Sequence, residues 1–209
     1  MAITKLQAES LNLADDFTFT GTVAGAGEPS YLVKLASTTV SSSVSSVSFD
    51  GYFDDNTYNT YKVFINNASL NTGNSFGFRV NVSNSPVTTS TYYYVAIEGN
   101  MLKDSSSNVA VRSANTWGYI NLTGGWGTSQ VSSTYTNNFE ISFGNPTQAN
   151  SSKAFNCLSS FLSENNPPYL VSQKVFGYNT GTSGLTGLTF INSSGGNITG
   201  GTFTLYGIV

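Results

Sequence analysis

The segment NITGGTFTLYGIV, residues 197–209, is rich in apolar residues and carries no charged side chain. A frayed tail would be polar and tolerant of change, so this segment has a structural role. Phe203 and Leu205 lie two residues apart, which places both on one face of a β-strand. The segment therefore predicts the last, buried strand of a β-sandwich.

The strict alternation of this segment breaks at Leu205 and Tyr206. Such a break predicts a β-bulge, and Gly207 can adopt backbone angles that other residues avoid. Tyr206 and Ile208 would then face the side opposite to the core. We expect these two residues to contact a neighbouring subunit.

The same period of two recurs along the chain and is clearest in FGFRVNV, residues 76–82, where every second residue is apolar. Other alternating segments are FTFTGTV (17–23), SVSSVSF (43–49), YKVFI (61–65), TYYYVAI (91–97), FEISF (139–143) and LTFI (188–191). Turn signals separate them, among them the firm break at Pro167 and Pro168. This spacing predicts an all-β fold of eight to ten strands with antiparallel connections.

Two segments leave alternatives open. KAFNCLSSFL, residues 153–162, has some helical spacing, but its Ser and Asn content favours a strand, with a short helix as the alternative. Residues 1–16 mix leucines with polar residues and suggest an arm that is partly helical, or else a first edge segment of the domain. We expect an N-terminal arm over residues 1–30 and one sandwich domain over residues 31–209.

The composition narrows the class of partner. Only 9% of the 209 residues are charged, the net charge is −3, and the eight Lys and Arg residues are scattered. A nucleic-acid-binding protein needs a basic patch, so nucleic acid is not an expected partner. No apolar run is long enough to cross a membrane, and the first residues do not resemble a secretory signal peptide. Low charge suits neutral partners such as glycans or other proteins.

Catalytic and metal-binding patterns are absent from the sequence. The chain has no His and a single Cys, Cys157, which lies among apolar residues and predicts a buried, inert thiol. Asp50, Asp54 and Asp55 lie in one turn, where they form a Ca²⁺ site, a catalytic pair or a solvated turn capped by Asp. The solvated turn is the favoured interpretation. We expect no enzyme activity, no metal site and no cofactor.

Aromatic residues are the candidates for binding. Trp and Tyr rings stack on sugars and anchor protein interfaces. The candidate glycan or interface aromatics are Trp117, Tyr119, Trp126, Tyr92 and Tyr94. The alternative is that Trp117 and Tyr119 belong to a core strand and only Trp126 is near the surface. In TYYYVAI, residues 91–97, Tyr92 and Tyr94 share one face and Tyr93 lies on the other, and we expect at least one of these two rows to be exposed or to line a subunit contact.

GLTFINSSGGNITGGTFTLYGIV, residues 187–209, resembles the C-terminal signature of a family of bacteriophage virion proteins known from tail fibres and capsid-surface proteins. The resemblance covers roughly residues 35–209. The matching residues are Leu188, Phe190, Ser193–Gly196, Gly201, Thr202, Phe203, Leu205, Tyr206, Gly207 and Ile208 at the end, and Val47, Phe49, Tyr58, Tyr61, Val63 and Ile65 upstream.

This resemblance implies a jelly-roll-like antiparallel β-sandwich that assembles as a homotrimer on the surface of a virion. It implies a tail fibre or tip protein that contributes to recognition of host-surface glycan, with other virion structural proteins as partners. The alternative within the family is a capsid decoration, cement or head-fibre protein. A free carbohydrate-binding module is the rival from another class. In the virion the arm would dock on the particle.

Overall fold

Thirteen β-strands and no helix make up the part of the chain that the computed structural model describes, residues 31–71, 75–102, 107–123, 137–162 and 169–209. The strands are β1 (Leu32–Val40), β2 (Ser46–Asp50), β3 (Thr60–Leu70), β4 (Phe76–Val82), β5 (Ser85–Pro86), β6 (Tyr92–Leu102), β7 (Ser107–Trp117), β8 (Ile120–Asn121), β9 (Asn138–Gly144), β10 (Lys153–Leu162), β11 (Tyr169–Asn179), β12 (Gly187–Asn192) and β13 (Ile198–Ile208). The all-β prediction is confirmed. The count exceeds the eight to ten expected strands, partly because the two-residue strands β5 and β8 leave no alternation in the sequence.

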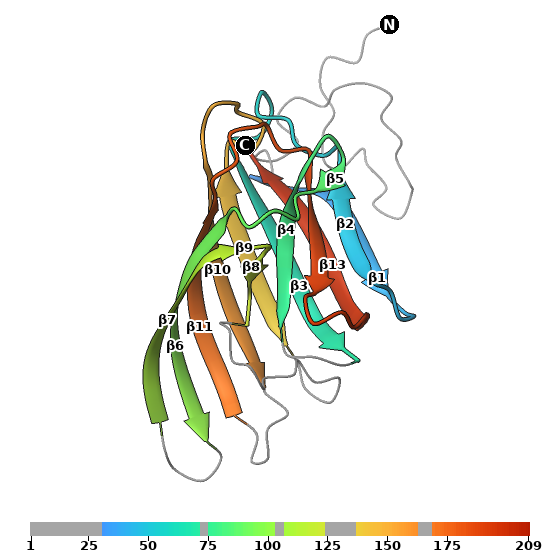
Figure 1. The fold of residues 1–209 in the computed structure, drawn as a ribbon. Helices are drawn as coiled ribbons and strands as arrows, with labels where there is room; N and C mark the ends of the chain where they lie inside the picture. Colours follow the sequence, from blue (N-terminus) through green and yellow to red (C-terminus); the bar gives the residue numbers. More distant parts are fainter. Residues whose placement is uncertain (1–30, 72–74, 103–106, 124–136, 163–168) are drawn as a thin grey trace, which may run out of the picture. The chain divides into compact units, whose positions relative to one another are not determined.

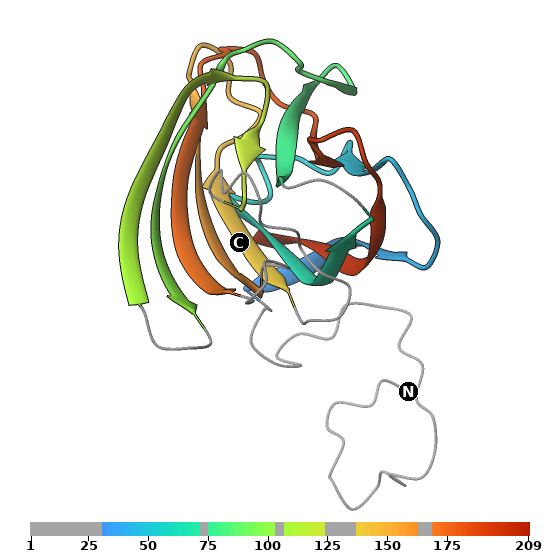
Figure 2. The same ribbon diagram turned by 60° about the horizontal axis from the view of Figure 1, so that its bottom comes forward.

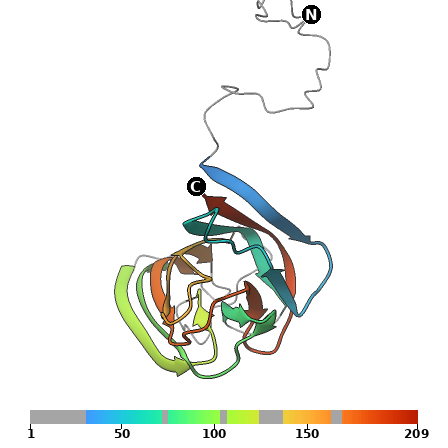
Figure 3. The same cartoon turned by 90° about the horizontal axis from the view of Figure 1, so that it is seen from above.

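The strands form two antiparallel sheets that pack as a jelly-roll-like β-sandwich (Figure 1). One sheet has eight strands in the order β1-β13-β3-β9-β10-β11-β6-β7. The shorter sheet has the order β2-β12-β4-β5, and β8 pairs with β4 beside it. The long sheet bends around the shorter one, as the two rotated views show (Figures 2 and 3). It therefore has an inner face against the core and an outer face.

The sandwich is one compact unit over Tyr31–Val209. The predicted arm over residues 1–30, including the FTFTGTV segment, lies outside the described residues, as do Pro167 and Pro168. No helix of the described residues is long and apolar enough to cross a membrane.

Aromatic rings from both sheets fill the core. Phe76, Phe78 and Phe190 project from the shorter sheet and are fully buried. They meet Phe155 and Phe203 of the long sheet, with ring centroids 5.1 Å apart for Phe78 and Phe155 and 5.3 Å apart for Phe190 and Phe203. Offset and edge-on contacts of this kind add stability beyond the area they bury. The alternating residues of the sequence thus form one continuous core.

The segment 153–162 is the strand β10, so the preferred interpretation is confirmed. Burial alternates along it residue by residue. Cys157 faces inward and is fully buried, as expected. Burial raises the pKa of its thiol, which keeps the group protonated and unreactive.

The predicted strand at 197–209 is β13, but its predicted bulge lies elsewhere. Phe203 and Leu205 face the core while Tyr206 and Ile208 alternate to the outer side without a break. The irregularity opposite Leu205 and Tyr206 is in β1, where Leu35 is the extra residue between Lys34 and Ala36. The shifts in β13 itself fall between Ile198 and Thr202. Leu205 and Tyr206 are two successive apolar residues because one faces the core and the other packs on Phe64 of the outer face.

Gly207 is required for space and not for its backbone angles. Its φ is not positive, in contrast to that of Gly201, which is +119°. A Cβ atom at Gly207 would lie 2.5 Å from ring atoms of Tyr58. The expectation of unusual backbone angles at Gly207 was therefore wrong, and the residue is small because an aromatic ring packs against the strand.

Candidate binding groove

The outer face of the long sheet has two halves of different chemistry. The half formed by β1, β13, β3 and β9, here called the polar half, carries mostly hydroxyl, amide and charged side chains. The half formed by β10, β11, β6 and β7, here called the apolar half, exposes large hydrophobic side chains. Its exposed or half-exposed apolar residues are Tyr93, Val95, Ile97, Val109, Val111, Leu158, Leu170, Phe176 and Tyr178.

A groove with a volume of about 610 Å³ lies at one end of the apolar half, across β6, β11 and β10. The strand register builds it, because Ala154 pairs with Tyr178 and Tyr178 pairs with Tyr93. Residues that are directly opposite in neighbouring strands point to the same face of a sheet. The groove is therefore a product of the register, and apart from Ser152 its lining residues lie on strands.

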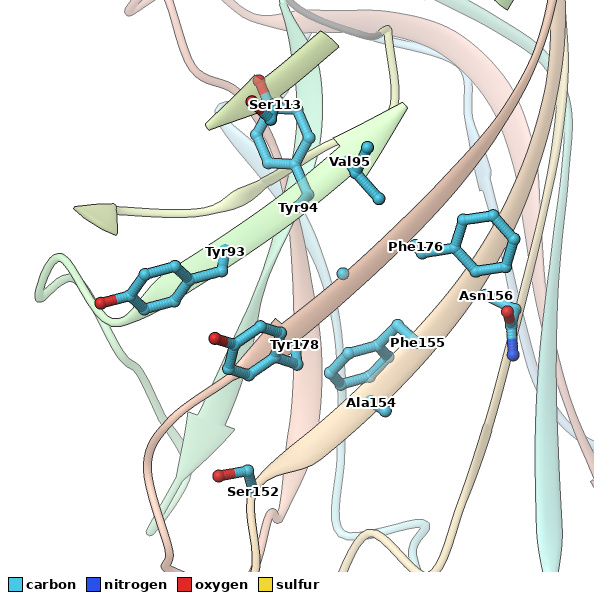
Figure 4. Close-up of a pocket in the computed structure, with 11 residues that line it drawn as sticks. Tyr93, Tyr94, Val95, Ser113, Ser152, Ala154, Phe155, Asn156, Phe176 and Tyr178 are labelled. Carbon is cyan, nitrogen blue, oxygen red and sulfur yellow. The ribbon is translucent and has the colours of Figure 1, made fainter. Parts of the chain in front are cut away.

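A stacked pair of tyrosines forms the aromatic platform of the groove. The rings of Tyr93 and Tyr178 are 5.1 Å apart and only 12° from parallel (Figure 4). Tyr178 is 41% exposed, so its ring is accessible while its neighbour holds it in place. A ring that is ordered before binding loses little conformational entropy when a ligand stacks on it.

Phe176 extends the platform along β11. It is 38% exposed and lies opposite Asn156 of β10 and Val95 of β6. The Nζ atom of Lys174 lies 4.7 Å from the centre of the Phe176 ring, which is a cation–π contact. The ligand-facing surface is therefore aromatic, with an ammonium group at its border.

Polar side chains line the margins of the groove. Ser113, Ser152 and Asn156 contribute two hydroxyl groups and a side-chain amide (Figure 4). These groups can donate and accept hydrogen bonds without carrying a charge. Aromatic surface with a few placed polar groups is the usual composition of a site for a small polar ligand.

A second hollow of about 470 Å³ adjoins the groove and shares Ser152, Ala154 and Asn156 with it. The turn between β9 and β10 forms its wall. Asp55 and Lys153 hold this turn in place. Asp55 Oδ2 accepts hydrogen bonds from the Thr147 backbone N–H and hydroxyl, at 2.9 and 2.7 Å.

Lys153, the first residue of β10, holds the same turn through hydrogen bonds to its backbone. Its Nζ donates to the carbonyl oxygens of Gln148 and Ser151, at 2.6 Å each. The side chain is almost fully buried, and this burial lowers the pKa of the ammonium group, although the nearby Asp55 charge opposes the shift. The ammonium is thus used to order the turn beside the groove.

The predicted roles of Tyr92 and Tyr94 as accessible aromatics need correction. Tyr92 is not part of the groove, and Tyr94 lies along it with its ring almost fully buried. Tyr92 is fully buried and Tyr94 is 5% exposed, because the alternation of β6 turns both to the core. The hydroxyl of Tyr92 accepts from the Val80 N–H at 3.0 Å and donates to the Val87 carbonyl at 2.8 Å. The accessible tyrosine of this strand is Tyr93.

The remaining predicted aromatics have mixed outcomes. Trp117 is half-buried and packs edge-on against Tyr94 and Tyr119, with ring centroids 5.7 and 5.3 Å away. Trp117, the last residue of β7, packs against the core, as the alternative interpretation held, whereas Tyr119 is half-buried and lies between β7 and β8, outside any strand. Trp126 lies outside the described residues. Tyr206 is on the outer face and meets Phe64 edge-on at 5.6 Å, and its subunit contact, like that of Ile208, stays a prediction.

Phe176 and Tyr178 were missed from the sequence. Their signal is present in VFGYN, residues 175–179, where Val175 faces the core and the aromatic residues alternate to the other face. An exposed aromatic row looks like a buried one when only the alternation is considered. The pairing with Tyr93 depends on strand order, which alternation does not contain.

The acidic turn has a structural role that fits the solvated-turn interpretation. Asp54 Oδ1 accepts from the Asn56 N–H at 3.0 Å and Oδ2 from the Thr57 hydroxyl at 2.7 Å. These hydrogen bonds lower the pKa of Asp54, with the Thr57 bond as the largest cause. Asp50 instead accepts from the Asn81 side-chain amide at 2.7 Å. The three carboxylates thus bond to different parts of the chain: Asp54 within its own turn, Asp55 to Thr147 and Asp50 to Asn81.

Within the described ranges, no cluster of three or more His, Cys, Asp or Glu side chains is placed to hold a metal ion. The described residues that line the groove include no carboxylate. The arrangement supports stacking and hydrogen bonding to a ligand.

Comparison with known proteins gives no match to a family model, to a curated protein or to a solved structure.

Proposed function

We propose that this chain is a non-enzymatic structural protein on the surface of a bacteriophage particle, where it contributes to host recognition by binding glycan in the groove of the apolar half. The resemblance of residues 187–209 to phage virion proteins supports the location. The groove supports the activity. Its central feature is the stacked pair of Tyr93 and Tyr178, with centroids 5.1 Å apart and the Tyr178 ring 41% exposed.

The chemistry of the groove suits a sugar. A pyranose presents C–H bonds on its faces, which pack on aromatic rings, and hydroxyl groups on its rim. Tyr178 and Phe176 supply the rings, while Asn156, Ser113 and Ser152 supply hydrogen-bonding groups at the margins. The adjoining hollow gives room for a further sugar unit along β10. A short glycan chain is therefore the ligand that this surface accommodates.

Binding to polysaccharide purified from the host cell surface tests the activity. We expect Tyr178→Ala and Phe176→Ala each to weaken binding by about tenfold or more, because aromatic anchors carry most of the energy of such contacts. Phe64→Ala is the matched control: Phe64 is also an outward aromatic residue of this sheet, but it lies in the polar half. Equal binding by all three variants and the wild type would exclude the groove.

Immunogold electron microscopy with an antibody to the recombinant protein tests the location. Gold on the tail would support the recognition role. Gold on the capsid would favour a decoration protein, and particles without gold would exclude the virion assignment and favour a free carbohydrate-binding module.

A further inference from the structure

We propose that two copies of this chain pair through the edge strand β7, in antiparallel register, with a two-fold axis at Ala110. Two copies of the long sheet then form one continuous sheet, so the proposed assembly is a dimer and not the homotrimer that the resemblance implies. This inference concerns the partner of the edge strand β7, which shares Ser113 with the margin of the groove, and it does not depend on the proposed glycan binding.

The first argument is that β7 ends the long sheet. Within the described residues it pairs only with β6, and Figure 1 shows it at the border of the sheet. Alternate N–H and C=O groups of an edge strand point away from its single partner and can bond to another strand. From Tyr94–Ala114 to Met101–Ser107 the register with β6 has no shift, so a regular segment of β7 is available.

The second argument is that the opposite edge of the sheet is protected and this one is not. Proteins block edge strands with lysines and with bulges that turn the edge away. β1 has both, because Lys34 precedes the bulge at Leu35. In β7 the only register shift lies at the far end, between Tyr92 and Tyr94 of its partner, and the segment 107–113 contains no Lys and no Pro.

The third argument is the exposure of apolar side chains on this edge. Val109 is 81% exposed and Val111 is 69% exposed, the highest values among the large hydrophobic residues that the structure describes. Ile97, the partner of Val111 in β6, is 48% exposed. Single exposed valines are common, but two consecutive outward residues of an edge strand, next to further apolar residues, form a patch that favours an interface.

The symmetry of the β7 sequence indicates that its partner is β7 of a second copy of the chain. Residues 107–113 are SNVAVRS, which is nearly palindromic about Ala110. An antiparallel pair centred on Ala110 places Val109 opposite Val111 of the second copy. By the two-fold symmetry, Val111 then lies opposite Val109 of the second copy. Arg112, the single charged residue of β7, falls opposite Asn108 and not opposite its own copy. The strand is thus complementary to itself, as a two-fold interface requires.

The surface area that this pairing would bury is typical of a reversible dimer. Pairing over this segment would bury on the order of 1,000 Å² in total, near the lower limit for specific interfaces. We therefore expect a dimer that dissociates on dilution in the micromolar range. The two-fold axis of such a pair is perpendicular to the sheet, so both outer faces point to the same side. If the proposed function holds, two grooves would face one host surface together.

Sedimentation velocity over a range of concentrations tests the pairing. We expect the wild type to dimerise, and Val111→Lys to weaken the dimer by at least tenfold. Thr39→Lys is the matched control, because Thr39 is an exposed, outward residue of the opposite edge strand β1. We expect Thr39→Lys to dimerise like the wild type. Circular dichroism and melting temperatures would show that each variant is folded.

Two double variants test the register itself. Val109→Lys with Val111→Glu places a lysine opposite a glutamate of the second copy, and should restore the dimer in a salt-sensitive manner. Val109→Lys with Val111→Lys changes the same positions but sets like charges against each other, and should be monomeric. A monomeric or trimeric wild type, dimer loss in Thr39→Lys, or equal behaviour of the two double variants would overturn the proposal.

Discussion

The two halves of the outer face belong to one sheet and share one inner face, yet they differ in what they offer to solvent. In the polar half, hydroxyl groups pair across strands: Ser37 with Thr204 and Thr39 with Thr202, each at 3.1 Å. In the apolar half, the corresponding positions hold residues such as Val111, which is left exposed. The inner face determines the fold in both halves, so the outer face is free to differ, and its apolar half is where we place binding.

The largest effect is expected from changes to the inner face, which the two halves share. Phe203→Ala in the polar half and Phe155→Ala in the apolar half each remove a fully or almost fully buried ring. We expect each change to lower the free energy of unfolding by about 3–5 kcal/mol, because each leaves a cavity in a packed core. Urea unfolding measures this loss. A loss under about 1 kcal/mol in either half would mean that the core is not continuous.

The inner face is also the part that sequence reasoning could predict. Tyr61, Val63 and Ile65 share a face by simple alternation, and all three are fully buried. The same alternation in β4 buries Phe76, Phe78 and Val80, but Val82 at the end of the strand is only half-buried. Burial of alternate residues is a local property, so it can be inferred from a short window.

The groove could not be predicted in the same way, because it depends on which strands become neighbours. Tyr93 and Tyr178 are far apart in the sequence and meet only because β11 pairs with β6. Alternation placed Tyr92 and Tyr94 on one face but did not reveal that this face is the core. The bulge opposite Tyr206 was likewise assigned to the wrong strand, since its extra residue, Leu35, lies at the other end of the domain sequence.

The buried face of β6 makes the stability of the protein sensitive to alkaline pH. Burial raises the pKa of Tyr92 to about 12, and its neutral hydroxyl donates to the Val87 carbonyl. Since the folded-state pKa is above the ordinary value of 10, this contribution to stability is complete below pH 10 and is lost as the pH rises towards 12. Burial raises the pKa of Tyr61 as well, which adds to the trend.

We therefore expect the free energy of unfolding to fall between pH 10 and 12, and Tyr92→Phe to make this fall smaller. The variant should cost about 1 kcal/mol at pH 8, because it removes the hydroxyl that bonds to two backbone groups. Urea unfolding at a series of pH values measures both effects. An unchanged slope in Tyr92→Phe would show that this hydroxyl is not the group that responds.

The smallest effect is expected inside the polar half, between β3 and β9. Lys62 and Glu140 form an ion pair with an Nζ to Oε1 distance of 2.5 Å, and each side chain is about one third exposed, at 32% and 30%. Partly exposed pairs contribute about 0–1 kcal/mol and are screened by salt. A double-mutant cycle with Lys62→Gln and Glu140→Gln should give a coupling within this range at low salt and near zero in 1 M salt. A larger, salt-insensitive coupling would contradict the assignment of this pair as a weak, partly exposed one.

The position of β13 has a consequence for how the protein is made. This strand is the last of the described strands to be synthesised, yet it lies inside the long sheet, between β1 and β3. Until it arrives, β1 has no partner in its sheet and β3 presents an open edge. Assembly of this end must therefore follow synthesis, and such distant pairing is slow. A chain interrupted shortly before β13 would retain most of its core residues but expose unpaired edges, which promote aggregation.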